Sequence, residues 1–153
     1  MKTAHRTASQ HKRKWQAEPG SIYRLMNRIQ PFTEPEQTKL NIPPRSAYES
    51  LRTGCGTEED FHTLAVVVNV VMIRAENIDP LMEQSAQVAC AAMMRTWARH
   101  KSSGRWGFDG PALQDIPPVI ELHEQLIALS TPQQMIDSMR EAIRRMDAGE
   151  VLQ

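Results

Sequence analysis

Apolar residues recur every three or four positions along most of the chain after residue 45, which is the period of an α-helix with one buried face. Each stretch starts near a residue that can cap a helix and stops near a glycine or proline. The expected helices begin at or near Ser46, Thr57, Asp79, Ile116 and Thr131. Strand alternation, hairpin signals and internal repeats are absent from the sequence. It therefore predicts an all-α protein, an antiparallel helical bundle of about five helices over residues 46–150.

One of these stretches, LAVVVNVVMI from Leu64 to Ile73, is apolar on nearly every side. Its β-branched residues favour a strand. The acidic helix start at Thr57–Asp60, the length up to Pro80 and the lack of a partner strand favour a helix. A helix that is apolar all round is normally the central one of a bundle. The pattern leaves open whether it is buried within one chain or across a dimer.

The first 45 residues have a different organisation. Residues 1–20 lack hydrophobic periodicity, so we expect a disordered basic arm. Residues 21–45 are expected to form a short helix followed by an extended linker rich in proline. The apolar stripe of this short helix consists of Ile22, Leu25, Met26 and Ile29. Whether this segment packs on the bundle or swaps onto a neighbouring chain is left open.

Charge divides the chain at nearly the same place. The 18 basic and 18 acidic residues cancel overall. Residues 1–28 nevertheless hold seven of the basic residues and one acid, so a cationic leader precedes a mildly acidic body. Runs of like charge are usually solvated tails, and some bind nucleic acid or an acidic partner.

The remaining composition narrows the class of protein. Aromatic residues make up only 5% of the chain and methionine occurs nine times, so the core is expected to be aliphatic and adaptable. No apolar run is long enough to span a membrane, and the N-terminal stretch lacks the apolar centre of a secretory signal. Two cysteines do not form a disulfide framework, so we expect a cytoplasmic protein.

The loop KSSGRWGFDGP, from Lys101 to Pro111, carries three glycines at a spacing of three. Neither a dinucleotide fingerprint nor a P-loop has this spacing in this context. One interpretation is a lid, in which Trp106 and Phe108 fold back over one end of the bundle. The other is a partner-binding loop in which Arg105, Trp106 and Phe108 make the contacts.

Two further segments suggest contact with nucleic acid. The run HKRKW contains Lys12, Arg13, Lys14 and Trp15, which offer cations for phosphates and a ring to stack on a base. A solubilising tail is the alternative. The last two expected helices and their short turn resemble a helix-turn-helix, although the turn lacks the usual glycine. The residues of the last helix that would face DNA are Gln133, Gln134, Arg140 and Arg144.

Candidate catalytic and metal-binding groups are few. The sequence HEQLI begins with His123 and Glu124, but Ile127 stands where a second zinc ligand is needed. Cys55 follows a glycine at a helix start, and His62 is the nearest base, with no third residue to orient it. We therefore expect no enzymatic activity, no metal and no cofactor.

Two stretches, YESLRTGCGTEEDFHTLAVVVNV and GRWGFDGPALQDIPPVIELHEQLIALST, resemble small helical proteins carried by proteobacterial phages and integrated elements. The resemblance covers about residues 48–146, and some of those proteins are labelled Fis-family regulators. It implies a mobile-element context and no catalytic residues.

Two hypotheses for the function follow. The first is a non-enzymatic phage or mobile-element protein that docks on a host or element macromolecule, most simply a protein, to regulate or inhibit it. The alternative is a DNA-binding transcriptional regulator that uses the basic arm and the last helix. Such a regulator is expected to bind DNA as a homodimer. RNA is a further candidate ligand of the arm, and a membrane is not expected as a partner.

Overall fold

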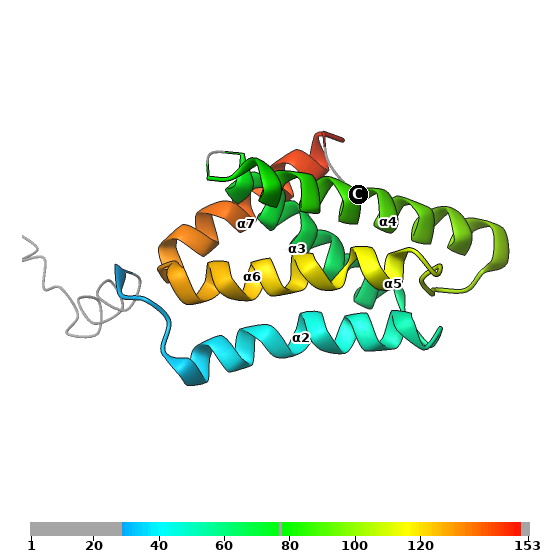
Figure 1. The fold of residues 1–153 in the computed structure, drawn as a ribbon, viewed down its shortest axis with the longest axis horizontal. Coiled ribbons are helices and arrows are strands. Elements are labelled where there is room, and N and C mark those ends of the chain that lie inside the picture. The colour runs from blue at the N-terminus through cyan, green and yellow to red at the C-terminus, as the bar shows by residue number, and fades with distance from the viewer. Residues whose placement is uncertain (1–28, 77, 151–153) are drawn as a thin grey trace, which may run out of the picture.

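The computed structural model describes residues 29–76 and 78–150, and all regular structure in these ranges is helical (Figure 1). The helices are α2 (Glu34–Arg52), α3 (Glu58–Ala75), α4 (Pro80–Ser103), α5 (Ala112–Asp115), α6 (Pro117–Leu129) and α7 (Pro132–Asp147). In these ranges the only β-type pairing is an isolated bridge between Gly56 and Trp106. The expected all-α bundle is therefore confirmed, with the one-turn helix α5 in addition to the five longer helices of the described part.

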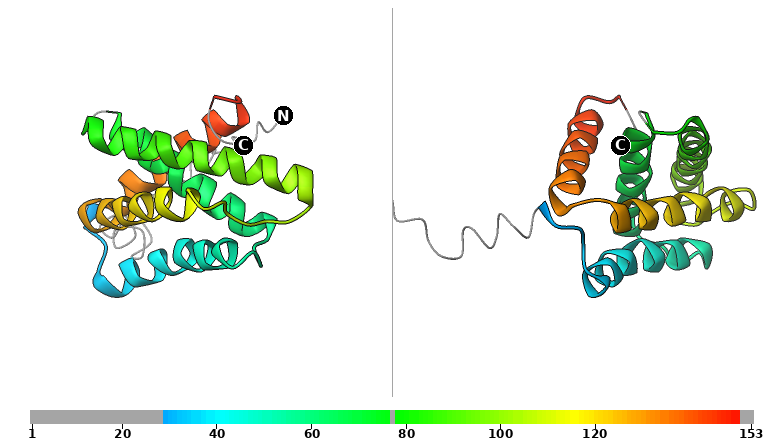
Figure 2. Two further views of the ribbon diagram at one scale, coloured as in Figure 1. Left: turned by 45° about the vertical axis from the view of Figure 1, so that its right-hand side comes forward. Right: turned by 60° about the vertical axis from the view of Figure 1, so that its left-hand side comes forward.

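The valine-rich helix α3 is the centre of the bundle. It packs against α2, α4, α6 and α7, and the right-hand view of Figure 2 shows it standing between α4 and α7. Most of its apolar residues are buried by other helices of the same chain, whereas Val66, Met72 and Ile73 are only partly buried.

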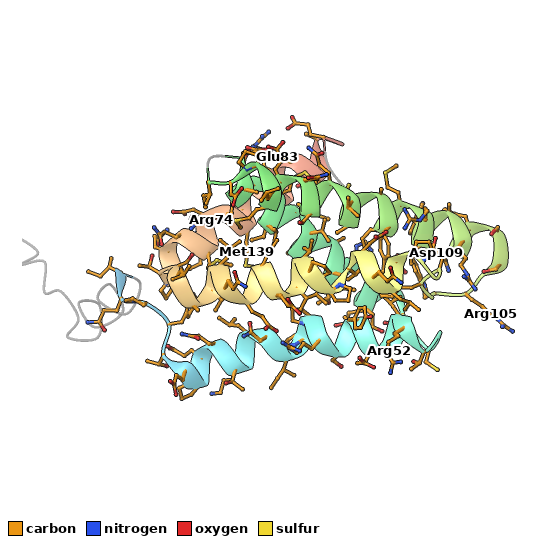
Figure 3. The ribbon with its side chains drawn as sticks, in the orientation of Figure 1. Arg52, Arg74, Glu83, Arg105, Asp109 and Met139 are labelled. Atoms are coloured by element: carbon orange, nitrogen blue, oxygen red, sulfur yellow. The ribbon has the colours of Figure 1, made fainter. Side chains whose placement is uncertain are left out.

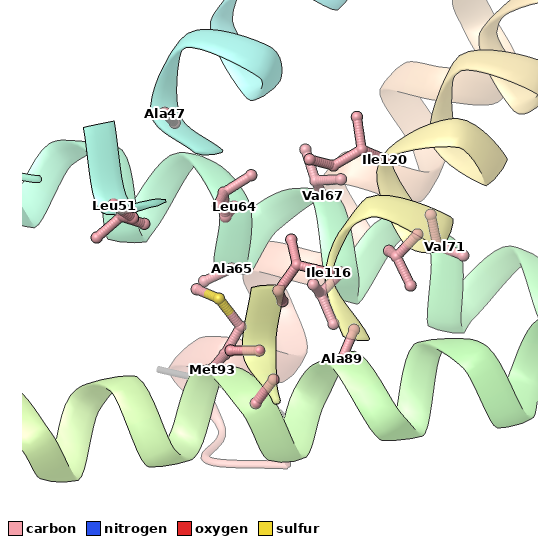
Figure 4. Close-up of a cluster of buried hydrophobic side chains, with 14 of the residues drawn as sticks. Ala47, Leu51, Leu64, Ala65, Val67, Val71, Ala89, Met93, Ile116 and Ile120 are labelled. Atoms are coloured by element: carbon pink, nitrogen blue, oxygen red, sulfur yellow. The ribbon is translucent and has the colours of Figure 1, made fainter. Parts of the chain in front are cut away.

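The main core lies where α3 meets α2, α4 and α6 (Figure 4). Leu64, Val71, Met93 and Ile116 are fully buried there. Burying one such side chain contributes roughly 1.5–3 kcal/mol to folding. Most of the buried side chains are aliphatic, as the composition predicts, and Met93 is among them, but Phe61 and Phe108 are also part of this core.

Local capping interactions set the helix starts. The Thr57 hydroxyl accepts a hydrogen bond from the Asp60 N–H at 3.2 Å, and the Asp60 carboxylate accepts one from the Thr57 N–H at 2.9 Å. Thr131 and Gln134 make the same reciprocal pair at α7, and Asp79 caps α4. These three helices start where the sequence predicts, because side-chain oxygens satisfy N–H groups that have no partner inside the helix.

The expected linker over residues 30–45 is wrong from Glu34 onward. Helix α2 starts there and continues through Pro43 and Pro44, so Ser46, the expected helix start, lies inside it. Proline in a helix interior removes one N–H and crowds the preceding turn. Here tertiary packing outweighs that cost, because Pro44 is buried against the neighbouring helices.

The sequence contains the signal for the true start of α2. Thr33 is followed three residues later by Glu36, whose carboxylate accepts a hydrogen bond from the Thr33 N–H at 2.8 Å. Pro35 occupies the first turn, where a missing N–H costs nothing. The predicted arm over residues 1–20, and the stripe from Ile22 to Met26, lie outside the described residues.

Candidate functional site

An apolar groove opens between the N-terminal half of α2 and the helices α3, α6 and α7. Its volume is about 350 Å³, which falls in the range of roughly 300–1,000 Å³ typical of ligand pockets. Its walls are formed by Phe32, Leu40, Pro43, Pro44, Thr63, Val66, Val67, Val70, His123, Ile127, Pro132, Met135, Ile136 and Met139. We call this surface the apolar groove.

The amphipathic pattern of α7 explains one wall of the groove. Met135, Ser138 and Ala142 are buried against the bundle, while Met139 lines the groove with 43% of its surface exposed. Methionine is unbranched and flexible, so this wall can adapt to the shape of what it contacts. Figure 3 shows Met139 on α7, far from the Arg105 end of the molecule.

The opposite wall is formed by residues between 32 and 44, in the segment that the sequence predicts to be an extended linker. Phe32 is half-buried, and Leu40 is 41% exposed at the groove edge. The rings of Pro43 and Pro44 complete this side. Large apolar side chains are thus left partly in water on both sides of one concave surface, which is typical of an interaction site.

His123 is the main polar group of the groove with unused hydrogen-bonding capacity. It is 9% exposed, and its Nδ1 is buried with no hydrogen-bond partner. Burial lowers the pKa of His123 to about 4, against a smaller opposing effect of Glu124, so the imidazole is neutral at pH 7. The sequence HEQLI, considered above for zinc, also suggests a partly exposed pair of His123 and Glu124 on the helix flank, and for His123 that expectation is wrong.

Thr63, the other polar residue of the groove, has already used its donor. Its hydroxyl donates a hydrogen bond to the Glu59 carbonyl oxygen at 2.9 Å within α3. The walls therefore offer an occupant apolar contact and very few polar partners. The best-suited occupant is one whose own polar groups are already satisfied.

The glycine loop lies at the other end of the bundle and forms a closed lid. The Trp106 ring stacks on His100 with centroids 3.8 Å apart and lies 4.9 Å from Phe61. The Phe108 side chain is buried, and its N–H donates a hydrogen bond to the Leu51 carbonyl oxygen at 3.1 Å. The structure therefore supports the lid interpretation of this loop.

Ion pairs hold the lid on α4. Arg95 donates to Asp109 at 2.8 Å and to Asp115 at 2.9 Å, and Arg99 donates to the Phe108 carbonyl oxygen at 3.3 Å. Of the three residues expected to contact a partner, only Arg105 is fully exposed, whereas Trp106 is half-buried and Phe108 belongs to the core. The loop consequently offers a partner little apolar surface.

The side chains of α7 expected to face DNA bind instead to groups on the same chain. Gln134 caps the helix, and Gln133 donates to Asp137 at 2.9 Å. Arg140 lies 3.8 Å from Asp137. These contacts pair the polar face of the helix with neighbouring acids and amides.

Arg144 is held between two acids. It donates to Glu141 at 2.9 Å and approaches Glu150 at 3.4 Å. Hydrogen bonds from Arg144 and Arg145 lower the pKa of Glu141 to about 2. The guanidinium group of Arg144 is therefore already engaged by carboxylates, which weakens the case for α7 as a DNA-reading helix. The arm residues Lys12, Arg13, Lys14 and Trp15 lie outside the described residues.

The groups considered for catalysis make separate local contacts in the described part of the chain. Cys55 is exposed, and its thiol lies 4.0 Å from the Thr53 carbonyl oxygen. His62 lies 3.6 Å from Glu58. Cys90 packs at the edge of the core, and burial raises the pKa of its thiol. Within residues 29–76 and 78–150, no three His, Cys, Asp or Glu residues are grouped to hold a metal ion.

No family model matches this sequence, and no curated protein or solved structure is significantly similar to it. In the described part of the chain, no helix combines the length and apolar character needed to cross a lipid bilayer. The functional argument therefore depends on the geometry of the apolar groove.

The sequence pattern did not reveal the groove, because its walls come from four helices and from a segment expected to be extended. A signal was nevertheless present. Once α2 is started at Thr33, Leu40, Pro43 and Ala47 fall at i, i+3 and i+7 and give one apolar stripe.

Proposed function

We propose that this chain is a non-enzymatic interaction protein that binds an amphipathic helix of a partner protein in its apolar groove. The observation that carries the proposal is the groove itself, a concave apolar surface whose rims keep Leu40 and Met139 partly exposed. A helix that places apolar residues at i, i+3, i+4 and i+7 into a hydrophobic groove is a recurrent mode of recognition.

The chemistry of the groove favours a helix over a small molecule. A drug-sized ligand usually needs several convergent polar groups to fix its orientation, and this groove offers the Nδ1 atom of His123 and little else. A helix satisfies its backbone N–H and C=O groups internally, so it can present only apolar side chains to the walls.

The biological setting is part of the proposal. The resemblance to proteins of phages and integrated elements suggests a cytoplasmic partner from the host or from the element, which the bound chain would regulate or inhibit. The lack of an assembled nucleophile and base among the described residues is consistent with a role in binding.

The experiment uses the full chain and a display library of amphipathic helical peptides. Peptides selected for binding are tested against Met139→Lys, which places a charge on the groove rim. Met94→Lys on α4 is the matched control, because Met94 is 61% exposed and lies outside the groove. We expect Met139→Lys to weaken binding at least about tenfold, which corresponds to about 1.4 kcal/mol, and Met94→Lys to leave it unchanged. Equal affinities for both variants would contradict the proposal.

DNA binding is a second proposal, and it depends on the leader. The excess of positive charge in residues 1–28 favours contact with phosphates. If Lys12, Arg13 and Lys14 make such contacts, changing all three to glutamine should reduce duplex binding and flatten its dependence on salt. Duplex binding that is absent at low salt would exclude this proposal while leaving the groove untouched.

A further inference from the structure

The outward face of α4 leaves large apolar side chains in contact with water. Leu81, Val88 and Met94 are 70%, 42% and 61% exposed, and the small residues Ala91 and Ala98 are exposed beside them. Their spacings of three and seven residues put all five on one side of the helix. The opposite side of α4 packs against α3, α5 and α6, so this outward face is available to a partner.

This face lies apart from the apolar groove. The groove walls belong to α2, α3, α6 and α7 and to the stretch just before α2, whereas α3 stands between α4 and α7 in the right-hand view of Figure 2. A partner on α4 therefore leaves the groove open.

The two ends of the outward face carry opposite charges. Glu83 accepts a hydrogen bond from the Gln87 amide at 3.2 Å, and Arg99 donates one to the Phe108 carbonyl oxygen at 3.3 Å. The ion pairs of the described part of the chain all involve other residues. Both charges therefore remain able to pair with an opposite charge on a second molecule.

These groups are placed symmetrically about Ala91. Glu83 stands eight residues before it and Arg99 eight residues after it, while Val88 and Met94 stand three residues before and after it. When two copies of α4 pack antiparallel about a two-fold axis at Ala91, each residue faces the one at the same distance on the other side. Glu83 then faces Arg99 of the other copy, and Val88 faces Met94 of the other copy. Each favourable contact occurs twice.

The same face disfavours a parallel arrangement. Parallel pairing would oppose Glu83 to Glu83 and Arg99 to Arg99, and like charges placed opposite each other repel. The small side chain of Ala91 at the axis allows the two helices to approach to about 8 Å, the short end of the usual range. Charge and shape thus favour the antiparallel pair.

We propose that the outward face of α4 binds the same face of a second copy of this chain and forms an antiparallel, two-fold symmetric homodimer. This inference is independent of the proposed function, because the groove takes no part in the interface. The dimer holds two open grooves in one assembly, which increases the avidity for a partner that carries two helices.

The first test is sedimentation equilibrium of the full chain and of two matched variants. At about 100 μM, above a micromolar dissociation constant, we expect wild type and the groove-rim variant Met139→Lys to be dimers. Met94→Lys places a charge in the interface and should raise the dissociation constant at least about tenfold. A monomeric wild type, or a dimer that Met94→Lys leaves intact, overturns the inference. A dimer that only Met139→Lys disrupts also overturns it, since the interface would then be the groove.

The second test exchanges the charges. Glu83→Arg alone and Arg99→Glu alone each place like charges opposite each other, so each variant should dimerise at least about tenfold more weakly than wild type. An equimolar mixture of the two variants should form a mixed dimer, because both facing pairs then have opposite charges. Native mass spectrometry identifies the mixed dimer by its mass. A mixed dimer no stronger than the dimers of the two single variants overturns the antiparallel pairing.

Discussion

The two ends of the bundle differ in how their apolar surface is covered. At one end the loop from Gly104 to Pro111 folds back, and its rings complete the core. At the other end the helices α2 and α7 leave a groove whose apolar rims stay partly exposed. Figure 3 shows the two regions well apart, marked by Arg105 at the lid and Met139 at the groove.

This difference distinguishes apolar residues that are used in packing from apolar residues that remain partly exposed. The lid contains aromatic side chains, the type that sequence reasoning associates with binding hot spots, yet they are used for packing. The groove contains proline, methionine and valine, which the sequence gives no reason to group. A partner is therefore expected at the end where apolar surface is incompletely covered by the chain itself.

The largest effect on stability is expected from truncating Phe108 in the lid. Phe108→Ala deletes a buried ring, which typically costs about 3–5 kcal/mol of unfolding free energy. Urea denaturation followed by circular dichroism measures this loss. Leu129→Ala is the control, because Leu129 is 83% exposed and its truncation should change stability by less than about 0.5 kcal/mol. A Phe108→Ala protein as stable as wild type would show that the loop does not close the core.

The next largest effect is a loss of stability at acid pH, caused by His123 in the apolar groove. The pKa of His123 falls from about 6.5 in an unfolded chain to about 4 in the folded one. Between these values the unfolded state binds the proton and the folded state does not. The contribution of His123 to the free energy of unfolding is therefore fully present above about pH 6.5. It falls by roughly 3 kcal/mol as the pH drops to 4.

Between pH 6.5 and 5 ordinary carboxylates stay ionised, so a change of stability in this window comes from histidines, and variants show which one. Denaturant unfolding at half-unit pH steps should give a slope in wild type that is lost in His123→Leu. His62→Gln is the control, since His62 is exposed on α3, and it should keep the slope. A wild-type slope close to zero in this window would mean that His123 is accessible to water.

A smaller effect on stability, with a large effect on binding, is expected at the groove rim. Met139→Lys should change the unfolding free energy by less than about 0.5 kcal/mol, because Met139 is substantially exposed. The same substitution should remove most binding of a selected helical peptide, measured by isothermal titration calorimetry. Phe108→Ala should show the opposite pattern at a temperature where it stays folded, with reduced stability and retained binding.

The smallest effect, when binding is counted together with stability, concerns the ion pair between Arg145 on α7 and Glu76 at the end of α3. Arg145 donates hydrogen bonds to both Glu76 and Glu141, and its hydrogen bond lowers the pKa of Glu76. The Glu76 and Arg145 side chains remain partly exposed, so Glu76→Gln should cost only about 0.5–1 kcal/mol. Thermal unfolding at low salt and at high salt checks this, since screening should reduce the difference. A loss that is independent of salt would indicate packing rather than charge.

Much of the fold could be predicted from the sequence because helix signals are local. Thr57, Asp79 and Thr131 each cap a helix through atoms within three residues. The start of α2 is not predicted because the prolines between residues 31 and 44 indicate an extended linker, whereas packing in the bundle outweighs the missing N–H groups of Pro43 and Pro44. Proline rules describe an isolated helix, whereas α2 is held by the bundle.

The site was less predictable because it depends on contacts between distant segments. Phe32 and Met135 line the same groove although about a hundred residues separate them in the chain. Trp106 was recognised as important, but its packing against Phe61 depends on how the loop after α4 returns to the start of α3. Only the three-dimensional arrangement shows that one end is closed by packing and that the other is left open as an apolar groove.

The central claim is that the apolar groove, rather than the glycine loop, receives a partner helix. The most direct measurement is a methyl and indole NMR titration of the full chain with a selected helical peptide. We predict shifts concentrated at Ile127, Met135 and Met139, with the Trp106 indole unchanged. Shifts concentrated at Trp106, or no shifts at the groove when the peptide is bound, would contradict the account.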